Sequence, residues 1–194
     1  MATVLNRDDI ILGLRELIAE LHSAGEVAGI RLVGGAALAL RHFDRGTTHD
    51  LDALHVKPGS DEAVAAAAGR VAERRGWDSD WLNFAVNSAD ALPTLGRTVE
   101  WEALYDDGTV IIETAAKEAL LAMKLRANRP GRDTRDIRNL LAMCGISSLE
   151  DAEDFYEEYY PGDGLTDRAV RIVTAILADG PGLRPEPLDI PDFG

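Results

Sequence analysis

The sequence predicts an α+β fold in which a small sheet is followed by a helical C-terminal part. Three observations support this: a strand–Gly-Gly–helix–strand pattern at 30–54, a hairpin pattern at 98–113, and helical periodicity through the C-terminal half. A helix between strands is expected to pack on one face of the sheet. A chain of 194 residues suits one domain with a helical appendage. We therefore expect a sheet domain over 1–115, a helical part over 116–180 and a flexible tail over 181–194.

The N-terminal part begins with an amphipathic helix from about Ile10 to Ser23, capped by Asp8 or Asp9. The elements expected after it are a strand at 30–33, a helix at 36–40, and a second strand that carries Asp50 and Asp52.

A third helix is expected over 61–75, between a capping Ser60 and a terminating Gly76. Strands at 98–105 and 109–113 then form the hairpin, and the later helices are expected at 115–129, 133–144, 149–159 and 163–178. The segment 77–97 is harder to interpret. Its apolar residues either stack on a base or pack in the core, and core packing is favoured; they are Trp77, Trp81, Leu82 and Phe84.

Composition limits the classes of function. The formal net charge is −14, which opposes broad binding to nucleic acid. Six of the twenty Lys and Arg residues nevertheless lie between 124 and 138, and this concentration is the clearest hint of a phosphate-bearing partner. We expect no membrane span, because no apolar run approaches about 18 residues, and no signal peptide, because residues 1–9 lack its basic region and apolar run. A cytoplasmic protein is therefore expected. Cys144 is the only cysteine and is expected to pack in the interior.

The strongest chemical signal is the pair Asp50 and Asp52. Alternate residues of a strand share a face, so the two carboxylates are expected side by side, with no basic residue between them. Such a pair is stabilised by a divalent cation. Gly34 and Gly35, between the strand and its helix, would let a phosphate approach the backbone. Phosphates beside paired carboxylates are typical of metal-assisted nucleotide chemistry.

These residues resemble the signature of the nucleotidyltransferase superfamily with the polymerase-beta-like palm. There, a glycine pair opens a helix after a strand, and an Asp-x-Asp lies on the next strand. The pattern from Arg45 through Thr47 to Asp52 resembles a minimal bacterial branch that includes AbiEii-like toxins. The resemblance implies a palm, with a small mixed sheet and helices on one face. It also implies Mg²⁺ at Asp50 and Asp52, and a nucleotide site with these residues: Gly34, Gly35, Ala36, Arg45, Thr47 and Lys124.

The resemblance extends to a Lys-x-x-Ala pattern at Lys124 and an Arg-x-x-x-Asp-x-x-Asp pattern ending at Asp133 and Asp136. By resemblance, Lys124 would bind the triphosphate, and Asp136 would orient Lys124 or accept a proton. The alternative is a structural Lys124–Asp136 salt bridge between two helices. A third metal ligand is left open among three candidates, Glu100, Glu102 and Glu113.

The expected function is Mg²⁺-dependent transfer of a nucleoside monophosphate from a nucleoside triphosphate. By resemblance the acceptor is an RNA, such as a tRNA, or a protein, and the chain is the toxin of a toxin–antitoxin system with a cognate antitoxin partner. Two alternatives stay open. One is a small-molecule, antibiotic-modifying nucleotidyltransferase, and the other is a non-catalytic member that binds a nucleotide or a partner.

Overall fold

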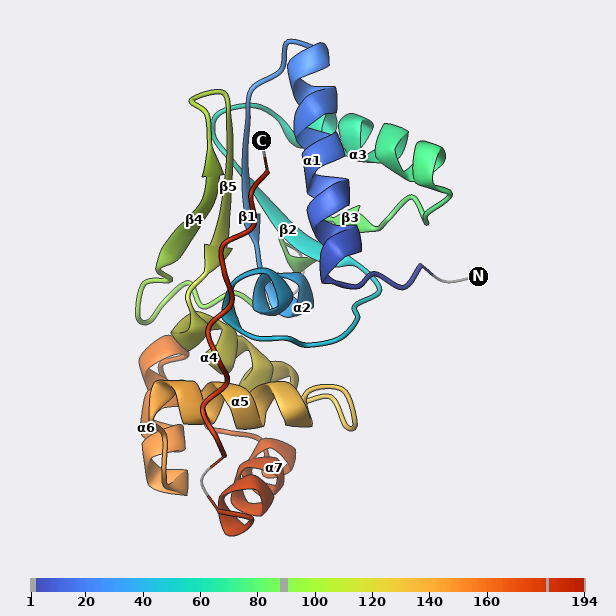
Figure 1. Ribbon diagram of the computed structural model, residues 1–194. Helices are drawn as coiled ribbons and strands as arrows, with labels where there is room; N and C mark the ends of the chain where they lie inside the picture. Colours follow the sequence, from blue (N-terminus) through green and yellow to red (C-terminus); the bar gives the residue numbers. More distant parts are fainter. Residues whose placement is uncertain (1–2, 88–90, 181, 194) are drawn as a thin grey trace. The chain divides into compact units, whose positions relative to one another are not determined.

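The computed structural model describes residues 3–87, 91–180 and 182–193, and it has an α+β fold (Figure 1). The chain divides into two compact units. Unit one comprises Met1–Ser88, Trp101–Ala115 and Pro187–Gly194. Unit two comprises Ala89–Glu100 and Ala116–Glu186.

Unit one contains a mixed sheet. Within the described residues, five strands lie in the order β3-β2-β1-β5-β4. β1 pairs antiparallel with β2 and parallel with β5, β2 pairs parallel with β3, and β4 pairs antiparallel with β5. The strand bounds are Ala28–Leu32 for β1, Leu51–Val56 for β2, Leu82–Asn83 for β3, Trp101–Asp106 for β4 and Val110–Ala115 for β5.

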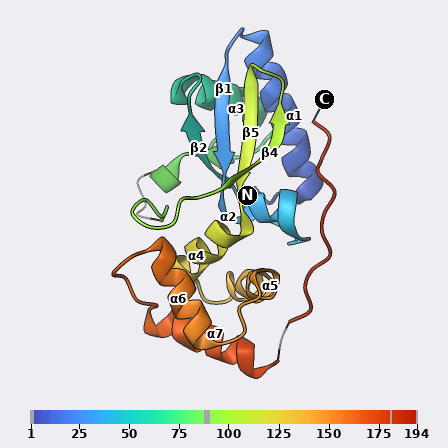
Figure 2. The same cartoon turned by 90° about the vertical axis from the view of Figure 1, so that its left-hand side faces the viewer.

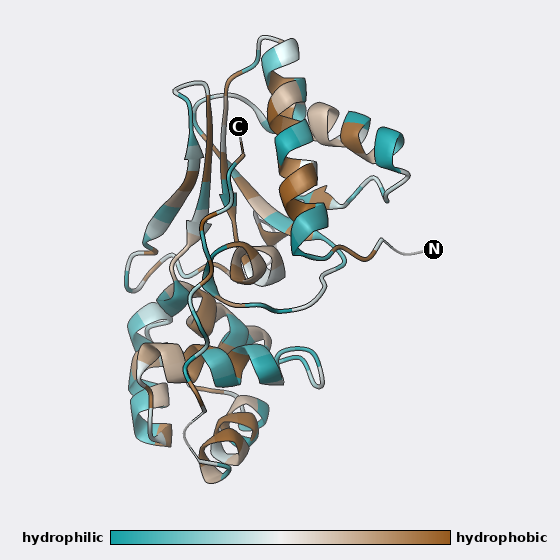
Figure 3. Ribbon diagram, viewed as in Figure 1, coloured by the Kyte–Doolittle hydropathy of each residue, from teal (hydrophilic) through white to brown (hydrophobic). Residues whose placement is uncertain are grey.

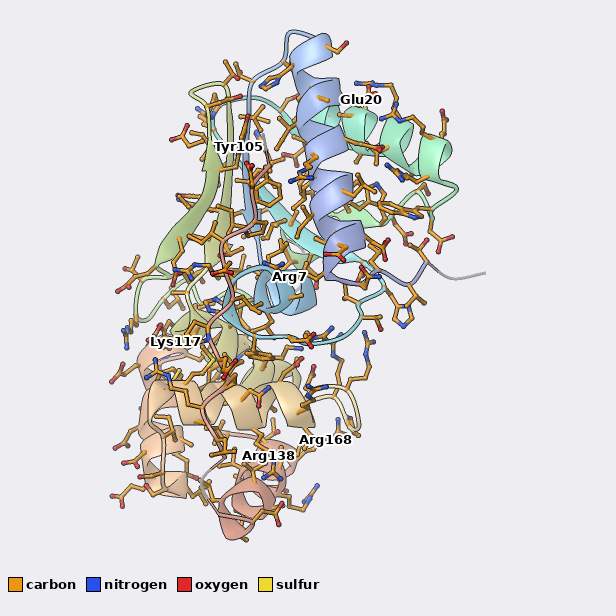
Figure 4. The ribbon with its side chains drawn as sticks, in the orientation of Figure 1. Arg7, Glu20, Tyr105, Lys117, Arg138 and Arg168 are labelled. Carbon is orange, nitrogen blue, oxygen red and sulfur yellow. The ribbon has the colours of Figure 1, made fainter. Side chains whose placement is uncertain are left out.

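Two helices cover one face of this sheet, α1 (Arg7–Ser23) and α3 (Asp61–Arg75). They pack side by side on the same face (Figures 1 and 2). Bands of brown and teal alternate along α1, the pattern of a helix with one apolar face (Figure 3). Ion pairs join the two helices at their exposed edge, where Glu20, labelled in Figure 4, accepts from Arg70 and Arg74.

Local signals set the helix ends, and one expectation about them was wrong. α3 matches its predicted range: the Ser60 hydroxyl accepts from Ala63 N–H, and Gly76 ends the helix with a φ of 67°. α1 begins earlier than expected because Asn6 caps it, rather than Asp8 or Asp9. The Asn6 side chain accepts from Asp9 N–H, and the Asp9 side chain accepts from Asn6 N–H in return.

The segment after α3 contributes a buried side chain to the hydrophobic core. Trp81 is fully buried, donates from Nε1 to the carbonyl of Ala68, and packs against Trp77. This agrees with core packing rather than base stacking for Trp81. β3 and the short 3-10 helix Ala85–Asn87 were not predicted.

The chain end returns to unit one. Arg7, labelled in Figure 4, donates from Nη2 to the carbonyl of Asp189 over 2.7 Å. Arg15 donates to the carbonyl of Asp192, and Phe193 is buried against Tyr105. The expected tail therefore has defined contacts over these residues.

Unit two is helical in its described residues, with four helices: α4 (Lys117–Ala127), α5 (Thr134–Cys144), α6 (Leu149–Tyr159) and α7 (Asp167–Ala178). α4 starts later than expected because Ala115 still belongs to β5. α7 also starts later, because Thr166 caps it through Ala169 N–H. No helix in the described part of the chain combines the length and apolarity that a membrane crossing requires.

Candidate functional site

The site in unit one is built on the turn between β1 and α2 (Gly34–Ala37), which a π-helical turn extends over Leu38–His42. The helix therefore starts at Gly34, earlier than the predicted Ala36. Gly34 has a φ of 66°, and a Cβ on it would lie 2.6 Å from Oδ2 of Asp52. Only glycine fits this position without moving the carboxylate. The turn thus holds the Asp52 side chain directly against the backbone at the start of α2.

The first backbone N–H groups of α2 form the second part of the site. These groups have no partner within a helix, and the N-cap residue Val33 makes no side-chain hydrogen bond to them. Ala36 has a fully buried side chain, so only its backbone can serve a ligand. The start of α2 therefore has the donors that a phosphate group would need.

The loop between α2 and β2 lies over Gly35. A Cβ on Gly35 would lie 2.8 Å from Nη1 of Arg45 and 2.9 Å from Oγ1 of Thr48. Arg45 also donates from Nη1 to the carbonyl of Thr47, over 2.7 Å. The structure thus brings Arg45 to the glycine turn, with Thr47 as its backbone partner. Thr48, which was not predicted as a site residue, is a direct neighbour of Gly35.

Asp50 lies just before β2 rather than on it, because the strand starts at Leu51. Its Oδ2 accepts a long hydrogen bond, 3.4 Å, from the amide of Asn83 on β3. Sequence reasoning did not find Asn83, because a strand of two residues carries no periodicity. Asp52 lies on β2 against the glycine turn, whereas Asp50 lies one residue before the strand.

Strand pairing shows on which face of the sheet two of the candidates for a third acidic ligand, Glu113 and Glu102, lie. Arg31 on β1 is paired with Leu54 on β2 and Glu113 on β5, so Glu113 shares the sheet face of Leu54 and Asp52. The Glu113 carboxylate, however, accepts from Arg31 Nε over 2.7 Å.

The other two candidates have different positions. Glu102 is paired with Thr114, so it lies on the opposite face, where it forms an ion pair with Arg41. Glu100 belongs to unit two. Within the described residues, no group of three or more His, Cys, Asp or Glu side chains is placed to hold a metal ion.

Lys124, Asp133 and Asp136 form a buried ion network in unit two. The Lys124 ammonium lies 2.6 Å from Oδ1 of Asp133 and 2.9 Å from Oδ2 of Asp136. Lys124 is 3% exposed and Asp133 0%, and Arg129 closes the network by donating from its backbone and side chain to Asp133. The Lys124–Asp136 salt bridge, which was the structural alternative to a catalytic role, is therefore present. Asp133 is a direct partner that the sequence interpretation had not assigned. Triphosphate binding by Lys124 and proton transfer by Asp136 stay predictions.

The network should make stability depend on pH. Burial opposes ionisation of Asp133, but Arg129 and Lys124 outweigh it and hold the pKa of this carboxyl below its ordinary value of 3.8. Its stabilisation is therefore complete above about pH 4 and lost as the pH falls toward the folded-state pKa. We expect the free energy of unfolding, from urea denaturation, to fall below about pH 4, and to fall less steeply in Asp133→Asn. Asp154→Asn, at an exposed position, should retain the full fall; equal slopes in all three proteins would contradict the assignment.

Histidines near the pair have structural partners. His42 is buried and its Nε2 lies 3.1 Å from the carbonyl of Ala115, while His49 Nδ1 contacts the carbonyl of Thr3. His55 Nδ1 lies 2.8 Å from Oδ1 of Asp61. Burial raises the pKa of the Cys144 thiol to about 12, so this residue is not a nucleophile at neutral pH.

Comparisons with known proteins give no family for the chain. No family model matches it, and neither does any curated protein or solved structure.

Proposed function

We propose that the chain is a nucleotidyltransferase with a palm-type sheet, which transfers a nucleoside monophosphate from a nucleoside triphosphate with the help of Mg²⁺. The observation that carries the proposal is the contact between Gly34 and Asp52. A left-handed glycine and a close carboxylate meet at the start of a helix whose N-cap residue, Val33, makes no side-chain hydrogen bond to it. Backbone donors for a phosphate and a carboxylate ligand for a metal ion would therefore lie next to each other.

The donor set fits magnesium. Mg²⁺ in proteins is bound by one or two carboxylates together with substrate phosphates and water. Asp50 and Asp52 would hold the ion, so a third protein carboxylate is not required. When bound, the ion would neutralise charge that develops on the triphosphate oxygens.

The other residues of unit one would bind and orient the nucleotide. Backbone N–H groups of Gly35 and Ala36 would donate to phosphate oxygens. Arg45, which lies over Gly35, would add a guanidinium to the same group. Asn83, which donates to Asp50, would fix the orientation of that carboxylate.

The acceptor and the biological role derive from the resemblance alone. They are transfer to an RNA such as a tRNA, or to a protein, and action as a toxin that a cognate antitoxin protein restrains. The mixed sheet and the Gly34–Asp52 contact support the transferase chemistry.

The test is nucleotide binding followed by transfer. We expect calorimetry to detect Mg²⁺-dependent binding of at least one of the four nucleoside triphosphates. Asp50→Asn/Asp52→Asn should weaken it by about tenfold or more, because the metal ligands lose their charge. Incorporation of label from α-³²P nucleotide into total RNA or protein should then be lost in the same variant.

The matched control is Asp8→Asn/Asp154→Asn, which changes the net charge equally at two exposed positions. Its affinity should stay within about twofold of the wild-type chain. Failure of every triphosphate to bind in the presence of Mg²⁺, or equal loss in both variants, would refute the proposal.

A further inference from the structure

Unit two contains an open surface cavity with a volume of about 450 Å³, between the loop that precedes α5 and one side of α7. This size lies within the range of small-molecule sites, roughly 300 to 1,000 Å³. Every lining residue belongs to unit two. The cavity therefore shares no residue with the glycine turn or the carboxylate pair of unit one.

The charge of the lining is positive. Arg168 and Arg171 come from α7, three residues apart, and Arg168 is labelled in Figure 4. Both are exposed, and in the described part of the chain no ion pair joins either of them to a carboxylate. Like charges three residues apart on a helix repel each other. The chain has 34 acidic and 20 basic residues, so two arginines with no ion pair to the described residues give this cavity a positive charge that attracts an anion.

The opposite wall adds hydrogen-bond donors. Thr134, which lines the cavity, is the first residue of α5, and the N-cap residue Asp133 makes no side-chain cap to this helix. The partial positive charge of the helix start therefore adds to that of the arginines. Asp133 is itself fully buried, and Lys124 and Arg129 neutralise it, so its carboxylate does not oppose an anion.

The remaining lining is apolar, with Pro130, Ile172 and Ala175. A bare inorganic ion would leave these side chains uncovered, whereas a phosphate ester would cover them with its organic part. We infer that this cavity binds the phosphate group of a nucleotide, either free or within a nucleic-acid strand. Arg168 and Arg171 contact the phosphate oxygens, and the sugar or base packs on the apolar wall.

The experiment uses the full chain with the unit-one site disabled, as the Asp50→Asn/Asp52→Asn variant in the presence of EDTA. The probes are AMP and uncharged adenosine, by calorimetry, and a fluorescein-labelled single-stranded RNA, by anisotropy. We expect AMP or the RNA to bind, and Arg168→Gln/Arg171→Gln to weaken that binding by about tenfold or more. The control, Lys57→Gln/Arg184→Gln, removes the same charge at exposed residues that do not line the cavity and should change the affinity by less than about twofold.

If AMP but not the RNA binds, and the binding requires Arg168 and Arg171, the ligand is a free nucleotide. If the RNA binds and its binding requires the two arginines, the ligand is a nucleic-acid strand. Equal binding of adenosine and AMP, equal loss in the control, or no binding of any probe would overturn the inference. Circular dichroism on every variant verifies the fold. Because the metal site is disabled throughout, neither result bears on the proposed transferase activity.

Discussion

Replacing Lys124 with methionine is expected to lower the free energy of unfolding by about 3 to 5 kcal/mol, the largest change in stability that we predict. Methionine keeps the apolar stem but removes the ammonium that lies within 2.9 Å of both Asp133 and Asp136. Asp133 then keeps its ion pair with Arg129, which is itself half-exposed along its side chain, whereas Asp136 loses its ion pair with Lys124. Urea denaturation followed by far-UV circular dichroism measures the change, because α4 and α5 both contribute to the helical signal.

Lys117→Met is the matched control on the same helix. Lys117 pairs with Glu118 at a partly exposed position, so its loss should cost less than about 1 kcal/mol. A Lys124→Met variant that unfolds like this control would mean that the ammonium does not stabilise unit two. Retention of full stability together with a loss of nucleotide affinity would instead favour the catalytic role of Lys124.

The elements with strong local signals were predicted well. α3 and α6 match their expected ranges because Ser60 and Ser148 supply side-chain caps, and Gly76 supplies the left-handed end of α3. The hairpin was expected at its position because Asp106 and Gly108 are turn residues. Each of these signals lies within a few residues of the element that it defines.

Features that depend on pairing over long distances were not predicted. β3 consists of two residues that become a strand only by pairing with β2, so neither the strand nor the Asn83–Asp50 contact left a pattern in the sequence. The sheet faces also required the register: Glu102 and Glu113 are equivalent in the sequence, and strand pairing alone separates them. The network around Lys124 was predicted in part. Helical spacing placed Asp133 and Asp136 on one face, but only Asp136 was expected to contact the Lys124 ammonium.

Replacing Gly34 with alanine is expected to weaken Mg²⁺-dependent nucleotide binding by about tenfold or more while costing about 1 to 2 kcal/mol of stability. The backbone cost arises because an L-residue with a φ near 66° places its Cβ against its own carbonyl. The loss of binding has a separate cause. The new Cβ would lie 2.6 Å from Oδ2 of Asp52, so the carboxylate must rotate away from the start of α2. Calorimetry with the triphosphate that binds most tightly, and urea denaturation, measure the two effects.

Gly25→Ala separates these causes, because Gly25 has a φ of 68° and its added Cβ would meet no atom within 4 Å. Both variants carry the same backbone strain, so they should lose similar stability, but only Gly34→Ala displaces a carboxylate. Equal nucleotide affinities in the two variants would mean that the position of Asp52 against the turn does not matter for binding. A specific loss in Gly34→Ala would tie nucleotide binding to the atoms that the glycine turn brings together, since the backbone strain is matched in the control.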